Sequence, residues 1–513
     1  MLWESFCHVV PCQMDTNKIS KPELLCQTPT NFELSLNIVN RIEVLYFTMS
    51  SVKKAIPTMM WATAALIAVQ SFLFGYTFSA LNPCLVVGGA NDSHKCYTGD
   101  DDCPPGSIYN DFDLTTLETS LATTLLVLGA WIGSMVGNDP ADKYGRRWTV
   151  LVNTSTFLVG GALVACGNLY AFYIGRFVTG FGVGVVSVVC PMLISELADP
   201  ENRGVLTTVH QLFLVIGIFF VSLLAYALVS TISHGWQYVL AFQIVPAALQ
   251  ILLNGYIPES PKWLIRNGRE SDALQVLLSL RPPSHDSQEE IDEFKRELQQ
   301  DIDNKSTATW GDLFGSGRPA AIGSLLMFFQ AMTGINTVIF YSTTIFGFAG
   351  FSQAILATAS VDGVNFAATV VAAYLIDRVG RKFLLLVGQY IMIASLLLLA
   401  VILYVDVDPE LQGIIAVVAA LIYIAGFAVG LGAAIWSVIN EIMPSRLRAK
   451  GMSLFLSINW FFNLLIAFGT ISTINFLGDV NDDIDDDSVV NDAKKRGVSL
   501  LYFIFFGTPP RPL

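Results

Sequence analysis

Long apolar stretches alternate with short polar segments along most of the chain, and this alternation predicts membrane-spanning helices. Six apolar blocks between charged or Gly/Pro-marked breaks occupy the first half, near 58–86, 115–138, 148–167, 170–195, 206–231 and 236–257. A charged segment from Pro258 to Arg318 follows, and five more blocks lie near 319–347, 353–376, 383–405, 411–440 and 450–476. Blocks of this length can cross a hydrocarbon layer of about 30 Å.

A twelfth apolar segment, Val498 to Gly507, ends before the sequence Thr508 to Leu513. It is much shorter than the roughly 20 residues that a crossing helix needs. We therefore expect an all-α membrane protein of twelve spans whose last span is truncated. The predicted parts are a tail at 1–56, a six-helix bundle at 57–257, a linker domain at 258–318, a second bundle at 319–507 and a short tail at 508–513.

Residues 1–56 lack an apolar run of signal-peptide length with a small-residue cleavage site. We interpret them as a cytoplasmic tail. Met49 directly precedes the first span, so a shorter product that starts there is a second hypothesis for the N-terminus.

Composition agrees with this pattern. Of the 513 residues, 14% are charged and 53% are hydrophobic, whereas a soluble domain carries roughly a quarter of charged residues. The net charge of −13 argues against binding to nucleic acid, which requires basic faces. The eight cysteines include no CxxC pair, so neither a metal centre nor a cofactor is expected. Cys96 and Cys103 share one polar loop, where a disulfide and two free thiols are equally compatible with the sequence.

The basic residues predict the orientation in the membrane. Short loops and span ends of one side carry Lys143, Arg146, Arg147, Arg203, Arg378, Arg381, Lys382, Arg446, Arg448 and Lys450, and those of the other side carry Lys95, Lys494, Lys495 and Arg496. By the positive-inside rule, the first set, the N-terminus and the 258–318 segment are cytoplasmic. The sequon Asn91-Asp92-Ser93 then lies outside, where Asn91 is a candidate glycosylation site.

Two loop signatures occur once in each half, which indicates a duplicated six-span unit. Asp142-Lys143-Tyr144-Gly145-Arg146-Arg147 matches Asp377-Arg378-Val379-Gly380-Arg381-Lys382, and the pair Glu196 and Arg203 matches the pair Glu441 and Arg448. The glycines permit tight reversals between spans. The charges predict ion pairs that hold the halves together when the inner side is closed, with candidates Asp142, Arg146, Arg147, Glu196, Arg203, Asp377, Arg381, Glu441 and Arg448. Alternatively, these charges only anchor the topology.

These residues and several further motifs resemble the sugar porters of the major facilitator superfamily, in particular the animal facilitative glucose transporters. The resemblance covers about Met59 to Phe476. Its motifs include Gly175-Arg176-Phe177, Pro191 to Glu196, His210-Gln211-Leu212, Pro258 to Leu264, Gln330 with Gly334-Ile335-Asn336, Tyr341-Ser342, and Asn459-Trp460 with Asn463. It implies the major facilitator fold, in which a sugar is held between two six-helix bundles and exposed alternately to each side.

The resemblance also implies sugar contacts at Gln211, Gln330, Asn336, Asn365, Trp436, Asn459 and Asn463. The chemistry of these residues supports this independently, because amides donate and accept hydrogen bonds from hydroxyl groups without leaving a charge in the membrane. Asn459 and Asn463 are four apart and share a helix face, whereas Gln330 and Asn336 do so only if the helix breaks near Gly334. For any single amide, bonding between helices is the alternative interpretation.

Several positions depart from the family pattern. Ala331 replaces a second glutamine beside Gln330, which weakens the prediction of a particular hexose. Ala428 replaces a carboxylate, and Ala433 and Ile435 replace prolines, in the Gly-rich turn of the tenth span. Asp362 is a carboxylate inside the eighth span, and intramembrane charges are often proton relays or ligand contacts. However, Thr77 stands where proton-coupled members carry aspartate, so we favour uniport, with Asp362 as an extra polar contact or a neutral acid.

The sequence thus predicts a carrier rather than an enzyme: passive, alternating-access transport of a hexose across the plasma membrane. Glucose is the first candidate, and fructose and galactose are the alternatives. A proton-coupled sugar symporter is one alternative. A non-transporting sugar sensor is another, because the N-terminus is long and the last span is short. The expected partners are the hexose and the lipid bilayer, and the sequence does not indicate an oligomeric state.

Overall fold

The structure is a computed structural model that describes residues 57–85, 104–112, 114–199, 202–283, 285–303, 310–348, 353–405, 408–443, 447–479 and 487–507. Every regular element in these residues is a helix. The expected N-terminal tail, Asn91, Cys96 and Cys103 lie outside the described residues. The side chains of Asp377, Trp436, Glu441 and Arg448 are also outside the description, although their backbones belong to helices.

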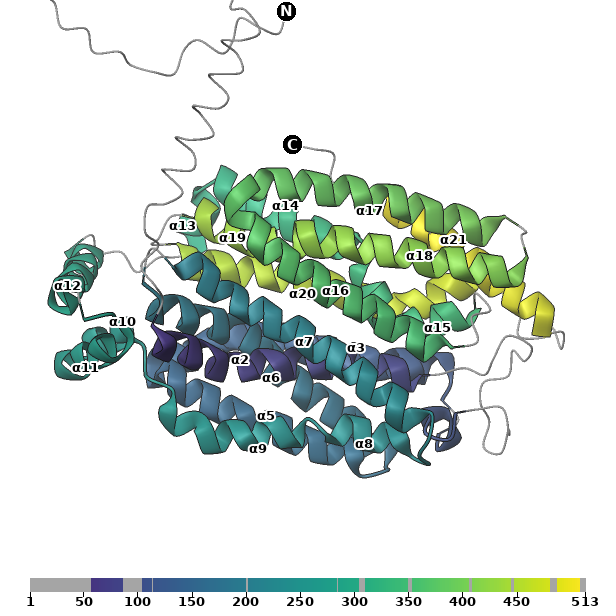
Figure 1. The fold of residues 1–513 in the computed structure, drawn as a ribbon, viewed down its shortest axis with the longest axis horizontal. Helices are drawn as coiled ribbons and strands as arrows, with labels where there is room; N and C mark the ends of the chain where they lie inside the picture. Colours follow the sequence, from purple (N-terminus) through teal and green to yellow (C-terminus); the bar gives the residue numbers. More distant parts are fainter. Residues whose placement is uncertain are drawn as a thin grey trace, which may run out of the picture. The chain divides into compact units, whose positions relative to one another are not determined.

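The first half contains six antiparallel spans (Figure 1). Their helices are α2 (Thr58–Ser79) with η1 (Asn82–Cys84), α3 (Thr116–Val136), α5 (Arg146–Ala165), α6 (Leu169–Leu197), α7 (Arg203–Val229), and α8 (Gly235–Ala241) with α9 (Ile244–Leu253) and η3 (Asn254–Tyr256). Polar residues at the predicted breaks fix the helix starts. Thr115 and Glu118 form a capping box for α3, and the Asn168 side chain accepts hydrogen bonds from the first backbone N–H groups of α6.

The second half repeats the plan. Its helices are α14 (Arg318–Met332), α15 (Ile335–Phe348), α16 (Ala354–Val379), α17 (Arg381–Tyr404), α18 (Pro409–Phe427), the π-helix η4 (Ala428–Gly432), α19 (Ala433–Ile442), α20 (Arg448–Leu477) and α21 (Asp487–Gly507). Within the described residues, eleven helical segments are long and apolar enough to cross a membrane, and they coincide with the eleven complete spans that the sequence predicts.

Helix α21 differs from the prediction at its start. It begins at Asp487 in a segment that the sequence assigns to a loop, and it continues through Lys494, Lys495 and Arg496 into the apolar residues. Small residues allow this extension, because α21 lies against the end of α20 where a side chain would collide. A Cβ at Gly497 would lie 1.9 Å from the carbonyl oxygen of Ile474. The helix is not among the eleven candidate spans, as expected for a segment with so short an apolar part.

The reversals predicted at the repeated loop signature are present. Gly145 separates α4 (Asn138–Tyr144) from α5 with φ of +105°, and Gly380 separates α16 from α17 with φ of +85°. Residues with a Cβ rarely adopt such angles, so glycine permits a sharp turn there. Both halves therefore use the same local device at corresponding places.

Two pairs of helices make the most extensive contacts between the two halves. Within the first half, α3 lies along α6 and α2 along α7; within the second half, α17 lies along α18 and α21. Across the boundary, α20 lies against α3, and α16 lies against α7 (Figure 1). The linker helices α10 (Pro261–Arg266), α11 (Glu270–Leu280) and α12 (Ser287–Asp303) gather at one end of the bundles, which we call the linker end. Helix α13 (Trp310–Gly315) leads from them to the second half.

Candidate functional site

A cavity of about 110 Å³ lies between the two halves, midway along the helices. A single buried water needs roughly 10 to 15 Å³ on the same measure, so there is room for several non-hydrogen atoms of a small solute. Both halves line it, with Phe74, Phe78, Ser187, His210, Gln211, Leu214, Val215 and Ile218 from the first and Gln330, Ile335, Asn336, Ile339, Asn365, Phe427, Ala428, Gly432, Leu456, Asn459, Trp460 and Asn463 from the second. Six of the seven predicted sugar contacts are in this lining; the seventh, Trp436, has no described side chain.

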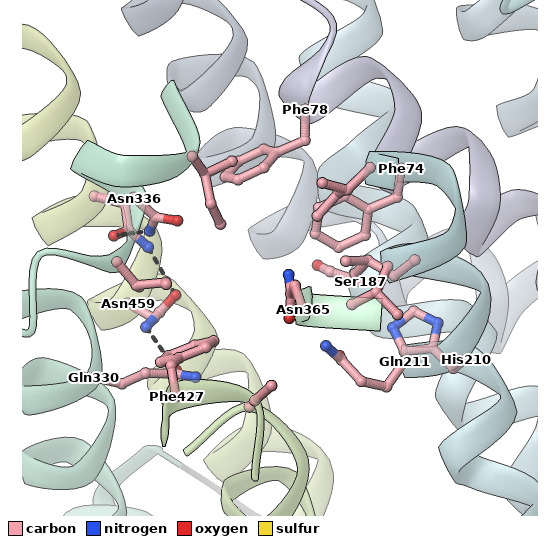
Figure 2. A pocket seen from close by; sticks show the side chains of 18 of the residues that line it. Phe74, Phe78, Ser187, His210, Gln211, Gln330, Asn336, Asn365, Phe427 and Asn459 are labelled. Carbon is pink, nitrogen blue, oxygen red and sulfur yellow. Dashed lines mark hydrogen bonds between the residues drawn. The ribbon is translucent and has the colours of Figure 1, made fainter. Parts of the chain in front are cut away.

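Four amides of the second half form a continuous hydrogen-bonded chain along one wall (Figure 2). Asn336 Nδ2 donates to Asn463 Oδ1 at 2.5 Å, Asn463 Nδ2 to Asn459 Oδ1 at 2.9 Å, and Asn459 Nδ2 to Gln330 Oε1 at 3.1 Å. Each amide thereby holds the next in one orientation. Because an amide has two donors and an acceptor with two lone pairs, the chain retains hydrogen-bonding capacity that can face the cavity.

A helix break brings Gln330 and Asn336 into the same chain. Helix α14 ends at Met332 and α15 begins at Ile335, with Gly334 between them at φ of +79°. A Cβ at Gly334 would also lie 2.5 Å from the ring of Phe505 in α21. The break near Gly334, on which a shared face for Gln330 and Asn336 depends, is therefore present. Ala331, where the family pattern has a second glutamine, is buried at 1% exposure and does not line the cavity.

The opposite wall carries fewer polar groups. Figure 2 shows Gln211 and His210 of α7 facing the amide chain across the cavity, with Asn365 of α16 beside Gln211. His210 shares a hydrogen bond of 2.6 Å with Ser71 Oγ of α2. This contact packs the imidazole between two helices of the first half. Gln211 and Asn365 have space in front of their amides.

Aromatic rings cover the cavity on the side away from the linker end. The ring centroids of Phe78 and Phe340 are 4.6 Å apart, and Trp460 lies 5.9 Å from Phe78 and 6.0 Å from Phe74. Farther along, Asn82 Nδ2 donates to Ser342 Oγ at 2.8 Å, which joins η1 to α15. The two halves are thus in contact at this end, and the cavity is closed there.

A π-helix borders the cavity on the tenth span. Residues Ala428–Gly432 form η4 between α18 and α19, and Phe427, Ala428 and Gly432 line the cavity. One-turn π segments inside α-helices are common at functional sites, because they leave backbone groups with altered hydrogen bonding. The sequence indicates a Gly-rich turn in this span but does not predict the π-helix.

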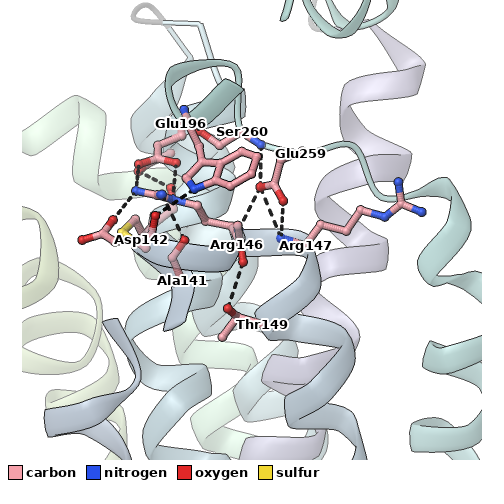
Figure 3. Close-up of polar contacts among 12 residues, drawn as sticks. Ala141, Asp142, Arg146, Arg147, Thr149, Glu196, Glu259 and Ser260 are labelled. Atoms are coloured by element: carbon pink, nitrogen blue, oxygen red, sulfur yellow. Dashed lines mark hydrogen bonds and ion pairs between the residues drawn. The ribbon is translucent and has the colours of Figure 1, made fainter. Parts of the chain in front are cut away.

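The predicted charges of the first half come together at the linker end (Figure 3). Arg146 pairs with Asp142 at 2.8 Å and with Glu196 at 3.1 Å, while Arg203 Nε donates to the carbonyl oxygen of Ser195 at 3.1 Å. For Arg147 the structure describes a hydrogen bond from the backbone N–H to Glu259, and it describes no ion pair of the side chain. In the second half, Arg381 begins α17, and the side chains of Asp377, Glu441 and Arg448 are not described. The described pairs all lie within the first half, so pairing between the halves stays a prediction.

Glu259 is a member of this cluster that sequence reasoning missed. Its carboxylate accepts hydrogen bonds from the backbone N–H of Arg146 at 2.9 Å and of Arg147 at 3.1 Å, at the N-terminus of α5. A carboxylate is favoured there by the exposed N–H groups and the helix dipole. Burial raises the pKa of Glu259 above its ordinary value, although these N–H groups and that of Ser260 act in the opposite direction. Its position in the Pro258 to Leu264 motif was the available signal.

A second ion cluster lies inside the linker domain. Arg281 and Glu290 are 3% and 7% exposed and form two hydrogen bonds, of 2.6 and 2.9 Å, and His285 bonds the same carboxylate at 2.8 Å. Burial would raise the pKa of Glu290, but Arg281 and His285 together hold it below its ordinary value. Arg281 Nη1 also donates to the carbonyl oxygen of Leu197 at 2.7 Å, which fastens the linker to the end of α6.

Asp362 does not join the amide wall. It is 4% exposed, and its Oδ2 accepts a hydrogen bond of 2.5 Å from Ser222 Oγ of α7. Asn365, one turn later on the same helix, lines the cavity, but Asp362 does not. The structure therefore places this carboxylate at the contact between α7 and α16.

The comparisons with known proteins agree with this geometry. The sequence model of a family described as "Sugar (and other) transporter" matches residues 63–509. Plastidic glucose transporter 4 of Arabidopsis thaliana is 33% identical over 369 residues, which are 71% of this chain and 66% of that protein. Glucose transporter GlcP of Staphylococcus epidermidis is 33% identical over 353 residues, which are 67% of this chain and 77% of that protein. The galactose-proton symporter of Escherichia coli K12 is 29% identical over 380 residues, 73% of this chain and 81% of that protein.

Solved structures share the fold. The proton:xylose symporter XylE of the major facilitator superfamily, bound to 6-bromo-6-deoxy-D-glucose, superposes with a TM-score of 0.69 at 23% identity, covering 88% of this chain and 96% of that one. A partially occluded inward-open form of XylE from E. coli gives a TM-score of 0.66 at 22% identity, covering 88% and 98%. The major facilitator fold predicted from the sequence is thereby confirmed.

Proposed function

The chain belongs to the sugar transporter family, a family of multi-pass membrane carriers that are not enzymes, and from this premise we propose that it transports a hexose, glucose in the first place, by passive alternating access. The observation that carries the proposal is the amide chain of the second half facing Gln211 and Asn365 across the cavity between the halves. Sugar transport itself is a property of the relatives named above, which include a glucose transporter and a proton symporter.

The cavity chemistry favours a neutral polyol. The amides of Gln211, Gln330, Asn336, Asn365 and Asn459 can donate to and accept from hydroxyl groups, and no charged side chain is in the described lining. Binding a neutral solute avoids the cost of leaving an unpaired charge in the bilayer. The rings of Phe74, Phe78, Phe427 and Trp460 supply apolar faces for the C–H surfaces of a sugar. We propose Gln211, Gln330, Asn336, Asn365, Trp436, Asn459 and Asn463 as its contacts.

The arrangement of the two halves supports alternating access. Contacts between Phe78 and Phe340, and between Asn82 and Ser342, join the halves at the end away from the linker. We propose that this end faces outside and that the linker end faces the cytoplasm, with the carrier in the plasma membrane. Release of the sugar requires weak binding, so we expect a dissociation constant on the order of millimolar. This corresponds to a binding free energy of about −4 kcal/mol.

Uptake of radiolabelled hexose tests the proposal in cells that lack their own hexose uptake. The full-length chain should restore saturable uptake of glucose, and unlabelled sugars that share its hydroxyl pattern should compete. Asn267→Leu is a matched control, because that amide is exposed on the linker and its described hydrogen bond goes to the backbone carbonyl of Trp263. Absence of uptake by a chain that reaches the cell surface would contradict the transport proposal. Accumulation of hexose above its outside level under an imposed proton gradient would contradict the passive mechanism.

A further inference from the structure

Asp362 forms a polar contact between the two bundles outside the sugar cavity. Ser222 is nineteen residues along α7, and Asp362 is eight residues after the start of α16, so both lie nearer the end away from the linker. The two helices lie side by side across the boundary between the halves (Figure 1). One turn towards the linker end, Phe219 and Phe366 stack with centroids 6.2 Å apart. This contact must part when the bundles separate at the end away from the linker.

Among the described residues, no basic side chain pairs with Asp362. His210 bonds Ser71, and Tyr76, Tyr341 and Tyr423 donate to backbone carbonyl groups. Arg176 of α6 donates to the carbonyl groups of Ala122 and Thr77. The other described titratable groups on the packed helices fall into three sets. The first set is exposed tyrosines, namely Tyr170, Tyr226, Tyr238, Tyr374, Tyr390 and Tyr404, and the second lies at helix ends, namely Glu196, Arg203, Arg378, Arg381 and Lys382. The third set donates to backbone carbonyl groups: Tyr173 to Glu118, Cys84 to Ala80 and Cys190 to Ile67. Ser222 supplies the hydrogen bond that is described for this carboxyl group.

The closed contact requires a neutral carboxyl group. A carboxylate removed from water needs a countercharge or several hydrogen-bond donors. A single hydroxyl donor stabilises the negative charge by less than the free energy lost on desolvation. A protonated acid has no such cost, and it can both donate and accept in a pair with serine. We propose that Asp362 is a proton-binding latch: it takes up a proton when α7 and α16 close and releases it when they part.

The latch exchanges its proton on one side only. Asp362 does not line the cavity, and it lies near the end away from the linker, so water reaches it when that end opens. During a transport cycle, the proton moves from outside water to the carboxylate at closure, and it returns to the same water at reopening. No proton crosses the membrane, so the sugar is not driven uphill. This inference rests on the proposed carrier function, and it adds control of a uniporter by the outside pH.

Exchange of labelled hexose at equal concentrations on both sides, with the inside pH held constant, tests the effect on flux. As the outside pH varies from about 5.5 to about 8, flux should pass through a maximum and fall severalfold on each side, because acid slows reopening and alkali slows closure. Asp362→Asn keeps the hydrogen bond but cannot titrate, so its flux should be flat over this range. The proposal is overturned if the wild-type profile is flat, if Asp362→Asn keeps the wild-type profile, or if hexose accumulates uphill.

A conformational measurement separates the latch from the transport proposal. Spin labels at Ser230 and Gln353, two exposed positions at the ends of α7 and α16 near the latch, report the distance between the bundles in protein whose native cysteines have been replaced. Acid should shift the distances to the short population in the parent protein, and Asp362→Asn should remain in it at every pH. An unchanged distribution with pH overturns the latch even if hexose flux is normal, whereas a pH-driven shift supports it even if no hexose is carried.

Serine variants give the matched controls. Ser222→Ala removes the hydrogen bond but leaves the acid, so the closed population should persist only at lower pH than in the parent protein. Ser360→Ala, on the same helix as Asp362, removes an exposed hydroxyl that bonds the carbonyl group of Leu356. It should leave the distance distribution unchanged. Equal effects of the two substitutions would overturn the assignment of Ser222 as the partner of the latch.

Discussion

The cavity and the linker end use polar groups in opposite ways. The cavity presents neutral amides, chained through Asn336, Asn463, Asn459 and Gln330, and the linker end presents buried ion pairs such as Arg281 with Glu290. An amide that loses a partner can satisfy itself with a sugar hydroxyl or water, so its bonds can exchange during a cycle. A buried ion that loses its partner is left uncompensated. From this difference we propose that the amides serve a changing partner, whereas the buried pair of Arg281 and Glu290 fixes a permanent contact.

The largest effect should come from breaking the linker ion pair. Arg281→Ala leaves Glu290 buried without its main partner, which typically costs about 3 to 5 kcal/mol. Hydrogen exchange of the backbone amides of α10, α11 and α12 should accelerate accordingly, while that of the membrane helices changes little. Glu290→Gln with Arg281→Met removes both charges and serves as the control, with a smaller loss. Unchanged exchange in Arg281→Ala would show that the pair does not hold the linker.

The next largest effect is expected from substitution of a cavity amide, and it should appear in hexose flux rather than in stability. Asn336→Leu removes a donor to Asn463 and a candidate sugar contact, so a loss of about 2 kcal/mol, or about thirtyfold in hexose flux, is expected. Gln211→Leu on the facing wall should act similarly. Cell-surface labelling corrects for the amount of each variant, and Asn267→Leu supplies the baseline. Flux equal to that of the control in both variants would rule out these amides as sugar contacts.

Much of this contrast could be predicted from the sequence. The spans and the reversals at Gly145 and Gly380 follow from hydropathy and glycine positions. The set of amides is what the resemblance to the sugar porters implies, and a shared face for Gln330 and Asn336 depends on a break near Gly334. The partner of Arg281 could not be predicted, because Glu290 lies nine residues away in a segment whose charges look solvated. Likewise, Asp362 could be recognised as a buried acid, but its contact with Ser222 depends on how two distant helices pack, which local periodicity does not specify. The π-helix has no spacing signature in the sequence.

Acid should distinguish the two regions. Since the pKa of Glu290 is lowered in the folded protein, its contribution to stability is fully present above its ordinary value near 4.5 and is lost as the pH falls through the lowered value. Linker hydrogen exchange, corrected for the intrinsic dependence on pH, should therefore accelerate in strong acid, by less than in Arg281→Ala because hydrogen bonds to a neutral acid remain. Glu290→Gln should abolish this acid step. Persistence of the step in that variant would assign it to another group.

The smallest effect is expected at the surface of the same domain. Lys262 and Glu297 form an ion pair of 2.8 Å, but both side chains are more than one third exposed, at 36% and 55%. Exposed pairs contribute little, so Lys262→Ala should change linker stability by no more than about 0.5 kcal/mol. The same exchange measurement provides the comparison with Arg281→Ala. An effect as large as that of Arg281→Ala would mean that exposure does not govern the strength of these pairs.

The three polar attachments described for the linker residues 258–281 lead to the first bundle. Arg281 bonds the end of α6, Glu259 bonds the start of α5, and Trp263 Nε1 donates to the carbonyl oxygen of Asp142. The small helical domain should consequently move together with the first bundle as one rigid body. A fluorophore on α12 would therefore keep a constant distance to the first bundle, while its distance to the second bundle would change with each conformational transition. This makes the linker domain a suitable site for labels in single-molecule measurements.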